Sequence, residues 1–336
     1  MANENLRKAN KAKKDEFYTQ LSDIEREVRN YKGQFKGKVV LCNCDDPRIS
    51  NFFHYFSYNF ESLGLKKLIT TCYKNQERDL FSKHKDEKAI YLEYNGDKNR
   101  NSLPDPQEIG IKYLKSDGDF RSKECIELLK QADIIVTNPP FSLFREYIAQ
   151  LIEYGKKFLI IGNVNAISYR ECFKLIKENK IWLGASIHSG DREFGVPDDY
   201  PLNAAGYRID SDGKKYIRVK GVRWFTNLDY KARHDNLILY KTYNAKIYPR
   251  YDYYDAIEVS KTADIPVDYA GIMGVPITFL DKYNPEQFEI VDGIGRYSML
   301  TGPTSKTRGT YLTKIKGKPM YARLIIKNKK LGVKQK

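Results

Sequence analysis

Apolar residues follow two alternating patterns over the first 180 residues. Short, nearly continuous apolar runs are typical of buried strands, and they occur at residues 38–44 (KVVLCNC), 66–73, 132–138 and 156–163. Apolar residues at helical spacing occur at 46–64, 122–131, 141–152 and 169–180, and Gly64 is suited to end the first of these helices. Strands that alternate with helices predict an α/β fold, doubly wound, with a mixed and mostly parallel sheet.

The pattern changes after residue 187, which predicts a second region. Residues 188–221 are rich in Gly, Asp, Pro and Lys, as in a surface insertion, and residues 222–228 (VRWFTNL) return to a strand-like run. Beyond residue 236 the chain is dense in Tyr, Pro and short irregular runs. We therefore predict one domain over 1–235, with 188–221 inserted in it, and a second region over 236–336.

Basic residues are concentrated near both ends of the chain. Lys and Arg number 58 against 43 Asp and Glu, which gives a net charge of +15. Residues 293–336 contain no acidic residue, and the first fourteen residues hold a smaller basic cluster. Segregated positive charge favours a polyanion such as nucleic acid, although a solubilising tail is the alternative. Leu324, Ile325 and Ile326 lie among the C-terminal charges, so part of that segment should be folded.

The composition does not favour a membrane, secreted or metal-binding protein. No apolar run approaches the ~20 residues of a membrane span, and the N-terminal MANENLRKANKAKK lacks the apolar stretch of a signal peptide. The five cysteines form no CxxC pair and the four histidines are far apart in the sequence. We expect a soluble, cytoplasmic protein with reduced thiols and no metal.

A four-residue motif, Asn138-Pro139-Pro140-Phe141, follows the apolar run at 132–138. Ligands of open α/β sheets bind at the carboxyl ends of strands, where this motif falls. The prolines fix two φ angles and remove two N–H donors, so the turn offers carbonyl acceptors beside the Asn138 oxygen and the flat face of Phe141. These groups suit an exocyclic amino group on a planar ring, such as adenine N6. The alternative is a tight loop with Phe141 in the core.

Two acceptors and an aromatic face around an amino group favour a reaction in which the amino nitrogen is the nucleophile. Hydrogen bonds to Asn138 and to the Pro139 carbonyl would localise the nitrogen lone pair as the nitrogen becomes tetrahedral, and they strengthen toward the transition state. A methyl donor would lie in line with the nitrogen at about 3–3.5 Å. Because a sulfonium is already a strong electrophile, no acid or base catalyst is strictly required. We therefore predict Asn138, Pro139, Pro140 and Phe141 as the catalytic set.

Stretches from nearly end to end of the chain carry a resemblance to a known family. They are KKDEFYTQLSDIE (13–25), VVLCNCDDPRISNFF (39–53), SDGDFRS (116–122), DIIVTNPPF (133–141), KKFLIIGNVNAI (156–167), IKENKIWLG (176–184), NPEQFEI (284–290) and RLIIKNKKL (323–331). In them the chain resembles the EcoRI-type adenine-N6-specific DNA methyltransferases of type II restriction-modification systems. The resemblance implies a Rossmann-like fold dependent on S-adenosylmethionine (AdoMet), a C-terminal target-recognition region, and methylation of adenine in duplex DNA with base flipping.

The resemblance also implies a set of cofactor-binding residues in three segments. They are Phe17, Tyr18, Thr19, Cys44, Asp45, Asp46, Asp117, Asp119 and Phe120. The first segment would bind the AdoMet carboxylate, the second its amino group, and the third its adenine. The second segment lacks the glycine of the family's loop, and either of its acids is also suited to N-cap the next helix. No acid follows the second strand, so the ribose contacts stay unassigned.

Eleven basic residues are the expected DNA contacts. They are Lys11, Lys13, Lys14, Arg308, Lys314, Lys316, Lys318, Arg323, Lys327, Lys329 and Lys330. The partner is thus expected to be double-stranded DNA, bound by a monomer in a bacterial or phage host. A restriction endonuclease of the same specificity is a possible companion without a stable complex, and GAATTC is the site that the resemblance suggests. The alternatives are an RNA-adenine or protein-glutamine methyltransferase of the same fold, and a catalytically silent DNA-binding relative.

Overall fold

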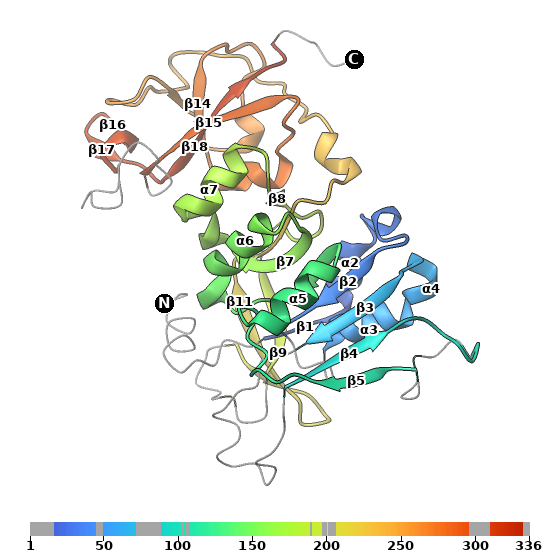
Figure 1. The fold of residues 1–336 in the computed structure, drawn as a ribbon. Helices are drawn as coiled ribbons and strands as arrows, with labels where there is room; N and C mark the ends of the chain where they lie inside the picture. The colour runs from blue at the N-terminus through green and yellow to red at the C-terminus, as the bar shows by residue number, and fades with distance from the viewer. Residues whose placement is uncertain are drawn as a thin grey trace. The chain divides into compact units, whose positions relative to one another are not determined.

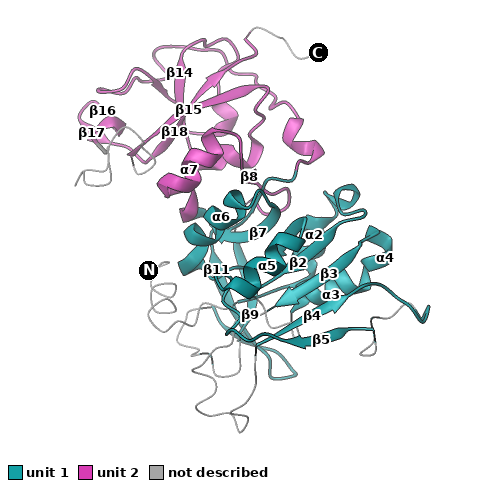
Figure 2. Cartoon of the chain, in the orientation of Figure 1, with its two compact units in different colours: residues 1–164, 189–228 teal, residues 165–188, 229–336 magenta. Residues whose placement is uncertain are grey.

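The computed structural model describes residues 17–44, 50–71, 89–101, 104, 108–188, 190–196, 200, 206–295 and 310–331. The chain separates into two compact units (Figure 2): unit 1 comprises Met1–Val164 and Ser189–Leu228, and unit 2 comprises Asn165–His188 and Asp229–Lys336. Six predicted site residues lie outside the described residues: Lys11, Lys13, Lys14, Asp45, Asp46 and Arg308.

Unit 1 is built on a mixed sheet whose strands have the order β5-β4-β3-β2-β6-β7-β12. The strands are β2 Val39–Cys42, β3 Lys67–Thr71, β4 Ile90–Tyr94, β5 Gly110–Tyr113, β6 Ile134–Thr137, β7 Lys157–Asn163 and β12 Val222–Thr226. The four central strands, β3-β2-β6-β7, pair in parallel. The outer strands β4, β5 and β12 pair antiparallel with their neighbours. This large mixed sheet with its helices is compatible with the predicted α/β fold. Among its described pairings, parallel pairing is confined to the four central strands, so the sheet is not mostly parallel as predicted.

Four of the five described helices of unit 1 correspond to helices that the apolar spacing predicts (Figure 1), with α3 and α4 together in the predicted 46–64, whereas α2 was not predicted. They are α2 Leu21–Val28, α3 Asn51–Tyr58, α4 Phe60–Leu63, α5 Lys123–Gln131 and α6 Phe144–Glu153, with short 3-10 helices at Lys32–Gln34 and Phe141–Leu143. A further 3-10 helix, Val164–Ser168, belongs to unit 2 except for its first residue. Ser50 and Ser122 cap the starts of α3 and α5, and Gly64, at φ 62°, ends α4 in the left-handed conformation. Helix α3 packs against β3, α5 against β2 and α6 against β7.

A second sheet of unit 1 comes largely from the stretch that we predicted to be a surface insertion, residues 188–221. It has the order β1-β9-β11-β10, with β1 Tyr18–Thr19, β9 Asp191–Val196, β10 Arg208–Ile209 and β11 Lys215–Lys220. All its described pairings are antiparallel. Phe194 of β9 and Ile217 of β11 are buried, so this sheet contributes its own apolar residues to the core of unit 1.

Unit 2 contains helix α7 Arg170–Lys177 and a four-stranded sheet of order β13-β14-β18-β15. The sheet strands are β13 Ile257–Glu258, β14 Ile272–Val275, β15 Phe288–Ile294 and β18 Arg323–Asn328. Unit 2 also contains β8 Trp182–Leu183 and a hairpin of β16 Lys314–Ile315 and β17 Lys318–Pro319. The 3-10 helices of unit 2 are Lys231–His234, Thr262–Asp264, Ile277–Lys282 and Thr310–Thr313. Leu324, Ile325 and Ile326 of β18 are fully buried, which confirms that the basic C-terminal segment is partly folded.

Residues 165–188, which we placed in the first domain, cluster with unit 2, where α7 packs against β15. Among the described residues, no helix combines the length and the apolar character that a bilayer crossing requires.

Candidate active site

The strand order of unit 1 reverses between β2 and β6. After β2 the chain adds β3 on one side, and β6 later pairs with β2 on the other side. Ligands of open α/β sheets bind outside the carboxyl ends of the strands at such a reversal. The residues that leave these two strand ends are Asn43 and Cys44 after β2 and Asn138 after β6. The catalytic turn predicted from the sequence therefore lies at the expected ligand position.

Asn138 is buried at this position with one end of its amide engaged. Its Nδ2 donates to the backbone carbonyl of Phe17 over 2.6 Å. Its Oδ1 is also buried and has no hydrogen-bond partner within the described part of the chain. A buried acceptor without a donor is costly and rare in folded proteins, and it often marks the position of a ligand. The amide oxygen is thus available to a donor that the described residues do not supply.

The rest of the motif forms a rigid turn. Pro139 is buried, Pro140 is half-buried, and the 3-10 helix that leads into α6 begins at Phe141. The carbonyl of Pro140 accepts from Leu143 N over 3.0 Å. Phe141 is 9% exposed, and its ring meets the ring of Phe17 edge-on at 5.8 Å. Because neither proline has an N–H group, the turn presents acceptors and no donor beside the Asn138 oxygen.

The N-terminal segment reaches the catalytic turn through β1. Tyr18 pairs with Gly195 and Thr19 with Phe194 of β9, and Asn51 donates to the Thr19 carbonyl over 2.7 Å. The hydroxyl Oγ1 of Thr19 is buried and, among the described residues, without a hydrogen-bond partner. Two unpartnered polar groups, on Thr19 and Asn138, therefore belong to segments that touch at Phe17.

The end of β2 is shaped by a buried tyrosine. Tyr147 of α6 donates its hydroxyl to Asn43 Oδ1, and burial raises the pKa of Tyr147 well above its usual value, so that the hydroxyl stays protonated. Cys44 follows at φ 82°, a backbone conformation that favours glycine. This turn directs the chain away from β2 at the point where the predicted loop begins.

The third predicted cofactor segment forms a compact loop before α5. Asp117 accepts from Asp119 N over 3.0 Å, and Phe120 packs edge-on against Tyr147 at 5.0 Å. The Arg121 guanidinium, 2.6 Å from the Asp119 carboxylate, lowers the pKa of that carboxyl. Phe120 thus touches the same tyrosine that contacts Asn43, whereas Asp119 is engaged with Arg121.

Several residues around the motif were not found from the sequence. Phe194, Tyr200, Asn51 and Tyr147 contact the predicted site residues, yet the sequence analysis assigned none of them to the site. Phe194 is separated from Phe17 by more than 170 positions, so only the fold brings them together. The apolar Phe194 and Val196, two positions apart in DREFGV, were the one sequence signal that could have identified β9.

The predicted DNA contacts divide into exposed and buried residues. Lys316 and Lys318 are exposed on the β16–β17 hairpin, where Lys314 is half-buried, and Lys327, at the end of β18, is exposed. Lys329 and Lys330 donate to Pro285 O and Asn236 Oδ1, over 2.8 and 3.1 Å.

Arg323 differs from the other predicted contacts. Its side chain is only 9% exposed and pairs with Glu258, which is 2% exposed, over 2.7 Å. Its guanidinium is already paired within unit 2, so we leave it out of the DNA-binding set.

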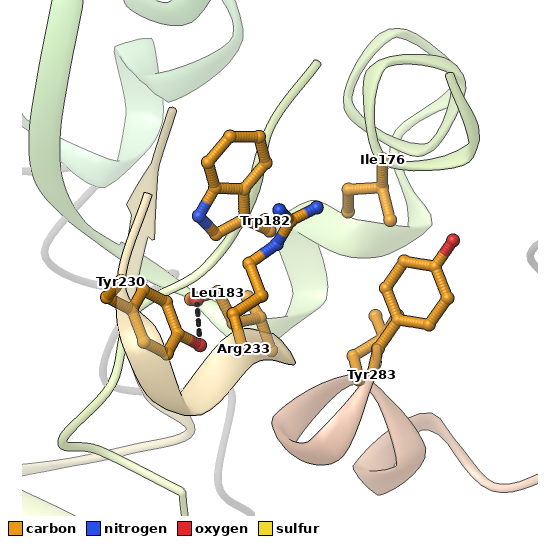
Figure 3. Close-up of a pocket in the computed structure, with 7 residues that line it drawn as sticks. Ile176, Trp182, Leu183, Tyr230, Arg233 and Tyr283 are labelled. Carbon is orange, nitrogen blue, oxygen red and sulfur yellow. Dashed lines mark hydrogen bonds between the residues drawn. The ribbon is translucent and has the colours of Figure 1, made fainter. Parts of the chain in front are cut away.

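Unit 2 has a hollow in which an arginine stacks on a tryptophan (Figure 3). It has an empty volume of about 280 Å³, part of which is open solvent. The guanidinium of Arg233 lies 3.8 Å from the ring of Trp182 and 3.4 Å from Asp229, and Tyr230 donates to the Leu183 carbonyl. The residues that line the hollow thus contact one another, and these contacts join residues 165–188 to the rest of unit 2. In the described part of the chain, His, Cys, Asp and Glu form no cluster suited to a metal ion.

The sheet thus has a buried amide oxygen at its switch point, without a donor among the described residues, beside a turn whose two prolines have no N–H group. The model of the family "Adenine-specific methyltransferase EcoRI" matches residues 5–329, and the chain belongs to this family. The resemblance found in the sequence, and the methyltransferase activity it implies, are thereby confirmed.

Three relatives match over nearly their whole length. The type II methyltransferase M.EcoRI of Escherichia coli is 51% identical over 331 residues, 98% of this chain and 98% of that protein. M.MgeORF184P of Mycoplasma genitalium is 40% identical, with 96% and 98% covered, and M.MpnI of Mycoplasma pneumoniae is 39% identical, with 96% and 97% covered. No solved structure is significantly similar to the chain.

Proposed function

We propose that the chain transfers a methyl group from AdoMet to N6 of an adenine in duplex DNA. The observation that carries the proposal is the buried Oδ1 of Asn138, which has no donor within the described residues. An adenine amino group has two N–H bonds, which suit this oxygen and a carbonyl of the Pro139-Pro140 turn. Both hydrogen bonds strengthen as the nitrogen gains positive charge, so they lower the barrier rather than merely bind the base.

The cofactor site is proposed beside this turn, at the ends of β2 and β6. The Thr19 hydroxyl is buried and, over the described ranges, unpartnered, so it fits a donor to the AdoMet carboxylate. Phe120, with the loop of Asp117 and Asp119, would hold the cofactor adenine, and Cys44 would line the loop for the amino group. When bound there, AdoMet supplies an electrophilic methyl carbon on a sulfonium. Asn138 and Phe141 would hold the target amine so that its lone pair points at that carbon.

We further propose that the sheet of unit 1 is a Rossmann-like methyltransferase sheet. The order β3-β2-β6-β7, with the first strand in the middle and the reversal next to it, supports this assignment. The antiparallel β12 beside β7 adds a strand that a purely parallel doubly wound sheet does not have.

The base must leave the duplex to reach a buried oxygen, and this costs a few kcal/mol of stacking and pairing. The β16–β17 hairpin is proposed as one source of compensating contacts. Lys314, Lys316 and Lys318 alternate along it, and none forms an ion pair within the described chain. The Asp252 carboxylate accepts from Lys316 N and Gly317 N, each over 2.8 Å, and so holds the hairpin tip in place.

The proposed partner is therefore double-stranded DNA, bound by a single copy of the chain. A restriction endonuclease of matching specificity would share the site without a stable complex, because competition for the same bases excludes simultaneous binding.

A methylation assay tests the proposal. Purified protein with labelled AdoMet should transfer label to duplex DNA as N6-methyladenine, and not to transfer RNA or protein. Asn138→Ala should lower kcat by at least ~100-fold, the effect of removing a transition-state hydrogen bond, with DNA affinity nearly unchanged. Asn30→Ala, at an exposed position after α2, is the matched control. Label in RNA or protein alone would overturn the proposal, as would full activity of Asn138→Ala.

A further inference from the structure

The orientation of the Asn138 amide is set by the N-terminal segment. Because the Phe17 carbonyl is only an acceptor, the amide must turn its nitrogen toward it, and the observed 2.6 Å contact from Nδ2 fits this. A rotation of the amide by 180° would bring two acceptors together at Phe17. It would also present an NH₂ group to the adenine amine, where two donors would meet. The hydrogen bond to Phe17 therefore favours the amide orientation that can accept from the adenine amine over the flipped orientation that cannot.

Phe17 is in turn held by aromatic residues of distant segments. Its ring is 3% exposed and lies 5.9 Å from Phe194 and 6.4 Å from Tyr200, in addition to its edge-on contact with Phe141. The next two residues form β1, which pairs with β9. The Phe17 carbonyl is thus fixed both by the packing of its own ring and by the ladder that follows it.

We propose that β9, through Phe194 and Phe17, is the element that keeps Asn138 oriented to accept from the adenine amine. Phe194 is a positioning residue, since it would act on Asn138 through its ring contact with Phe17. The inference rests on the proposed function and deepens it. It gives residues 188–221, which the sequence suggested to be a surface insertion, a role in catalysis.

The substitution Asn138→Asp tests the orienting contact. As a carboxylate, the side chain has no proton to donate to Phe17 O and sets a negative charge against that oxygen. As a carboxylic acid, it reproduces the amide: its O–H donates to Phe17 O and its C=O accepts from adenine. Burial and the facing carbonyl both raise the carboxyl pKa above the ordinary ~3.9.

The readout is the ratio of the variant's kcat to that of the unchanged enzyme, measured from pH 5.5 to 8.5. The ratio cancels titration of groups that both proteins share, such as Cys44, Asp117, Asp119 and Tyr147. We expect a loss of at least ~100-fold at pH 8.5, typical of a misplaced catalytic group, that becomes smaller as the pH falls. A ratio that does not change with pH would overturn the proposal.

A binding measurement gives a second readout that does not depend on turnover. Duplexes that contain the methylation site, identified by sequencing methylated DNA, are made with adenine or with purine at the target position; purine lacks the amino group. The unchanged protein should bind the adenine duplex more tightly, and Asn138→Asp should lose this preference at pH 8.5. An equal preference in both proteins would contradict the inference.

Phe194→Leu tests the positioning role at a distance. Phe60→Leu is the control, since Phe60 is also buried in unit 1 but packs on Tyr94, away from β1. We expect Phe194→Leu to lower kcat by about tenfold or more with little change in the KM for DNA, as a small displacement of reacting groups does. Phe60→Leu should affect thermal stability and leave kcat unchanged. Equal kcat values for the two variants would overturn the role of Phe194.

The two proposals fail in different ways. If the unchanged protein transfers no methyl group to DNA, the proposed function fails. If it is active while Asn138→Asp shows a constant ratio and Phe194→Leu has full kcat, only the positioning role fails.

Discussion

Arg323 donates to both carboxylate oxygens of Glu258 inside unit 2. Nη2 lies 2.7 Å from Oε1, and Nε lies 3.0 and 3.2 Å from Oε1 and Oε2. Tyr251 also donates its hydroxyl to Glu258, and burial raises the pKa of Tyr251 far above its usual value. The three side chains join β18, β13 and the segment before it, so the arginine holds unit 2 together.

Removal of Arg323 should therefore destabilise the protein. The change Arg323→Ala leaves the Glu258 carboxylate buried without its cation, which typically costs about 3–5 kcal/mol. Urea denaturation measures the difference. Lys327→Ala, at an exposed position of the same strand, should change the free energy of unfolding by less than about 0.5 kcal/mol. If the two substitutions have equal effects on stability, the pair does not have this role.

The hairpin lysines should instead affect DNA binding and its salt dependence. Lys316→Gln and Lys318→Gln together remove two exposed charges from the β16–β17 hairpin. Each lost phosphate contact lowers the slope of log affinity against log salt by about 0.9, so a decrease near two is expected in fluorescence anisotropy titrations. Lys130→Gln is the control, because that lysine already pairs with Glu127 over 2.7 Å. An unchanged slope would show that the hairpin does not contact phosphates.

These two cases show what composition could and could not predict. A basic run without acids predicted a polyanion partner, but it could not separate Lys327 from Arg323, which lie four residues apart in one strand. In β18 residues 323–326 and 328 are buried and only Lys327 is exposed, and the acid that neutralises Arg323 is 65 residues away. Charge is a local property of sequence, whereas pairing of charges depends on tertiary contacts.

The strands and helices over 38–71 and 122–163 were predictable because each depends on apolar spacing within a few residues. Strands β4 and β5, between these ranges, are not among the predicted elements. The turn at Asn138, which we propose as catalytic, could be singled out because two consecutive prolines after a buried run have few structural explanations. The support of that turn was not predictable. The contact from Asn138 to Phe17 spans 121 positions, and the β1–β9 ladder joins two segments that look polar and irregular in the sequence.

The interaction of His234 with two carboxylates should make stability depend on pH. Its ring nitrogens lie 2.8 Å from Asp229 and 3.0 Å from Glu286, and these hydrogen bonds raise the pKa of His234 above its usual value. A raised pKa means that the folded state favours the charged ring. The interaction therefore adds to the free energy of unfolding below the unfolded pKa of about 6.5. This stabilisation is lost as the pH rises through the higher pKa of the folded state.

The expected contribution is below about 1 kcal/mol, because the ring is 37% exposed and water screens the charges. The test compares the free energy of unfolding of the unchanged protein with that of His234→Gln at pH 6 and pH 9. The difference should be larger at pH 6. Equal differences at the two pH values would mean that the ring is not charged by these carboxylates.

A close approach of β7 to α6 should make Gly162 intolerant of a side chain. A Cβ atom at Gly162 would lie 2.5 Å from the ring of Phe144 and 3.0 Å from that of Phe225. Gly162→Ala should cost about 1–3 kcal/mol, as overpacking of a filled core does. It should also lower kcat, because α6 continues directly from the catalytic turn. Gly33→Ala is the control, since a Cβ there meets nothing within 4 Å; equal stability of both variants would contradict the argument.

The buried hydroxyl of Thr19 should matter to AdoMet and not to the folded protein alone. Thr19→Val keeps the shape of the side chain and removes a hydroxyl that has no partner in the described structure. Removing an unsatisfied buried group is neutral or stabilising, so the ligand-free variant should melt at the same temperature or higher. If Thr19 binds the AdoMet carboxylate, its affinity should fall by about tenfold, since one hydrogen bond to a charged group contributes about 1.5–3 kcal/mol.

Thermal shift and calorimetric titration with AdoMet measure the two effects separately. Thr262→Val is the matched control, because its Oγ1 is also buried and unpartnered in the described chain but belongs to unit 2. That variant should bind AdoMet as the unchanged protein does. A Thr19→Val protein that melts lower and binds AdoMet normally would show that the hydroxyl has a structural role. A Thr19→Val protein that melts at the same temperature or higher and binds AdoMet more weakly would place the carboxylate end of the cofactor at β1. Thr19 is two residues from Phe17, whose carbonyl orients Asn138.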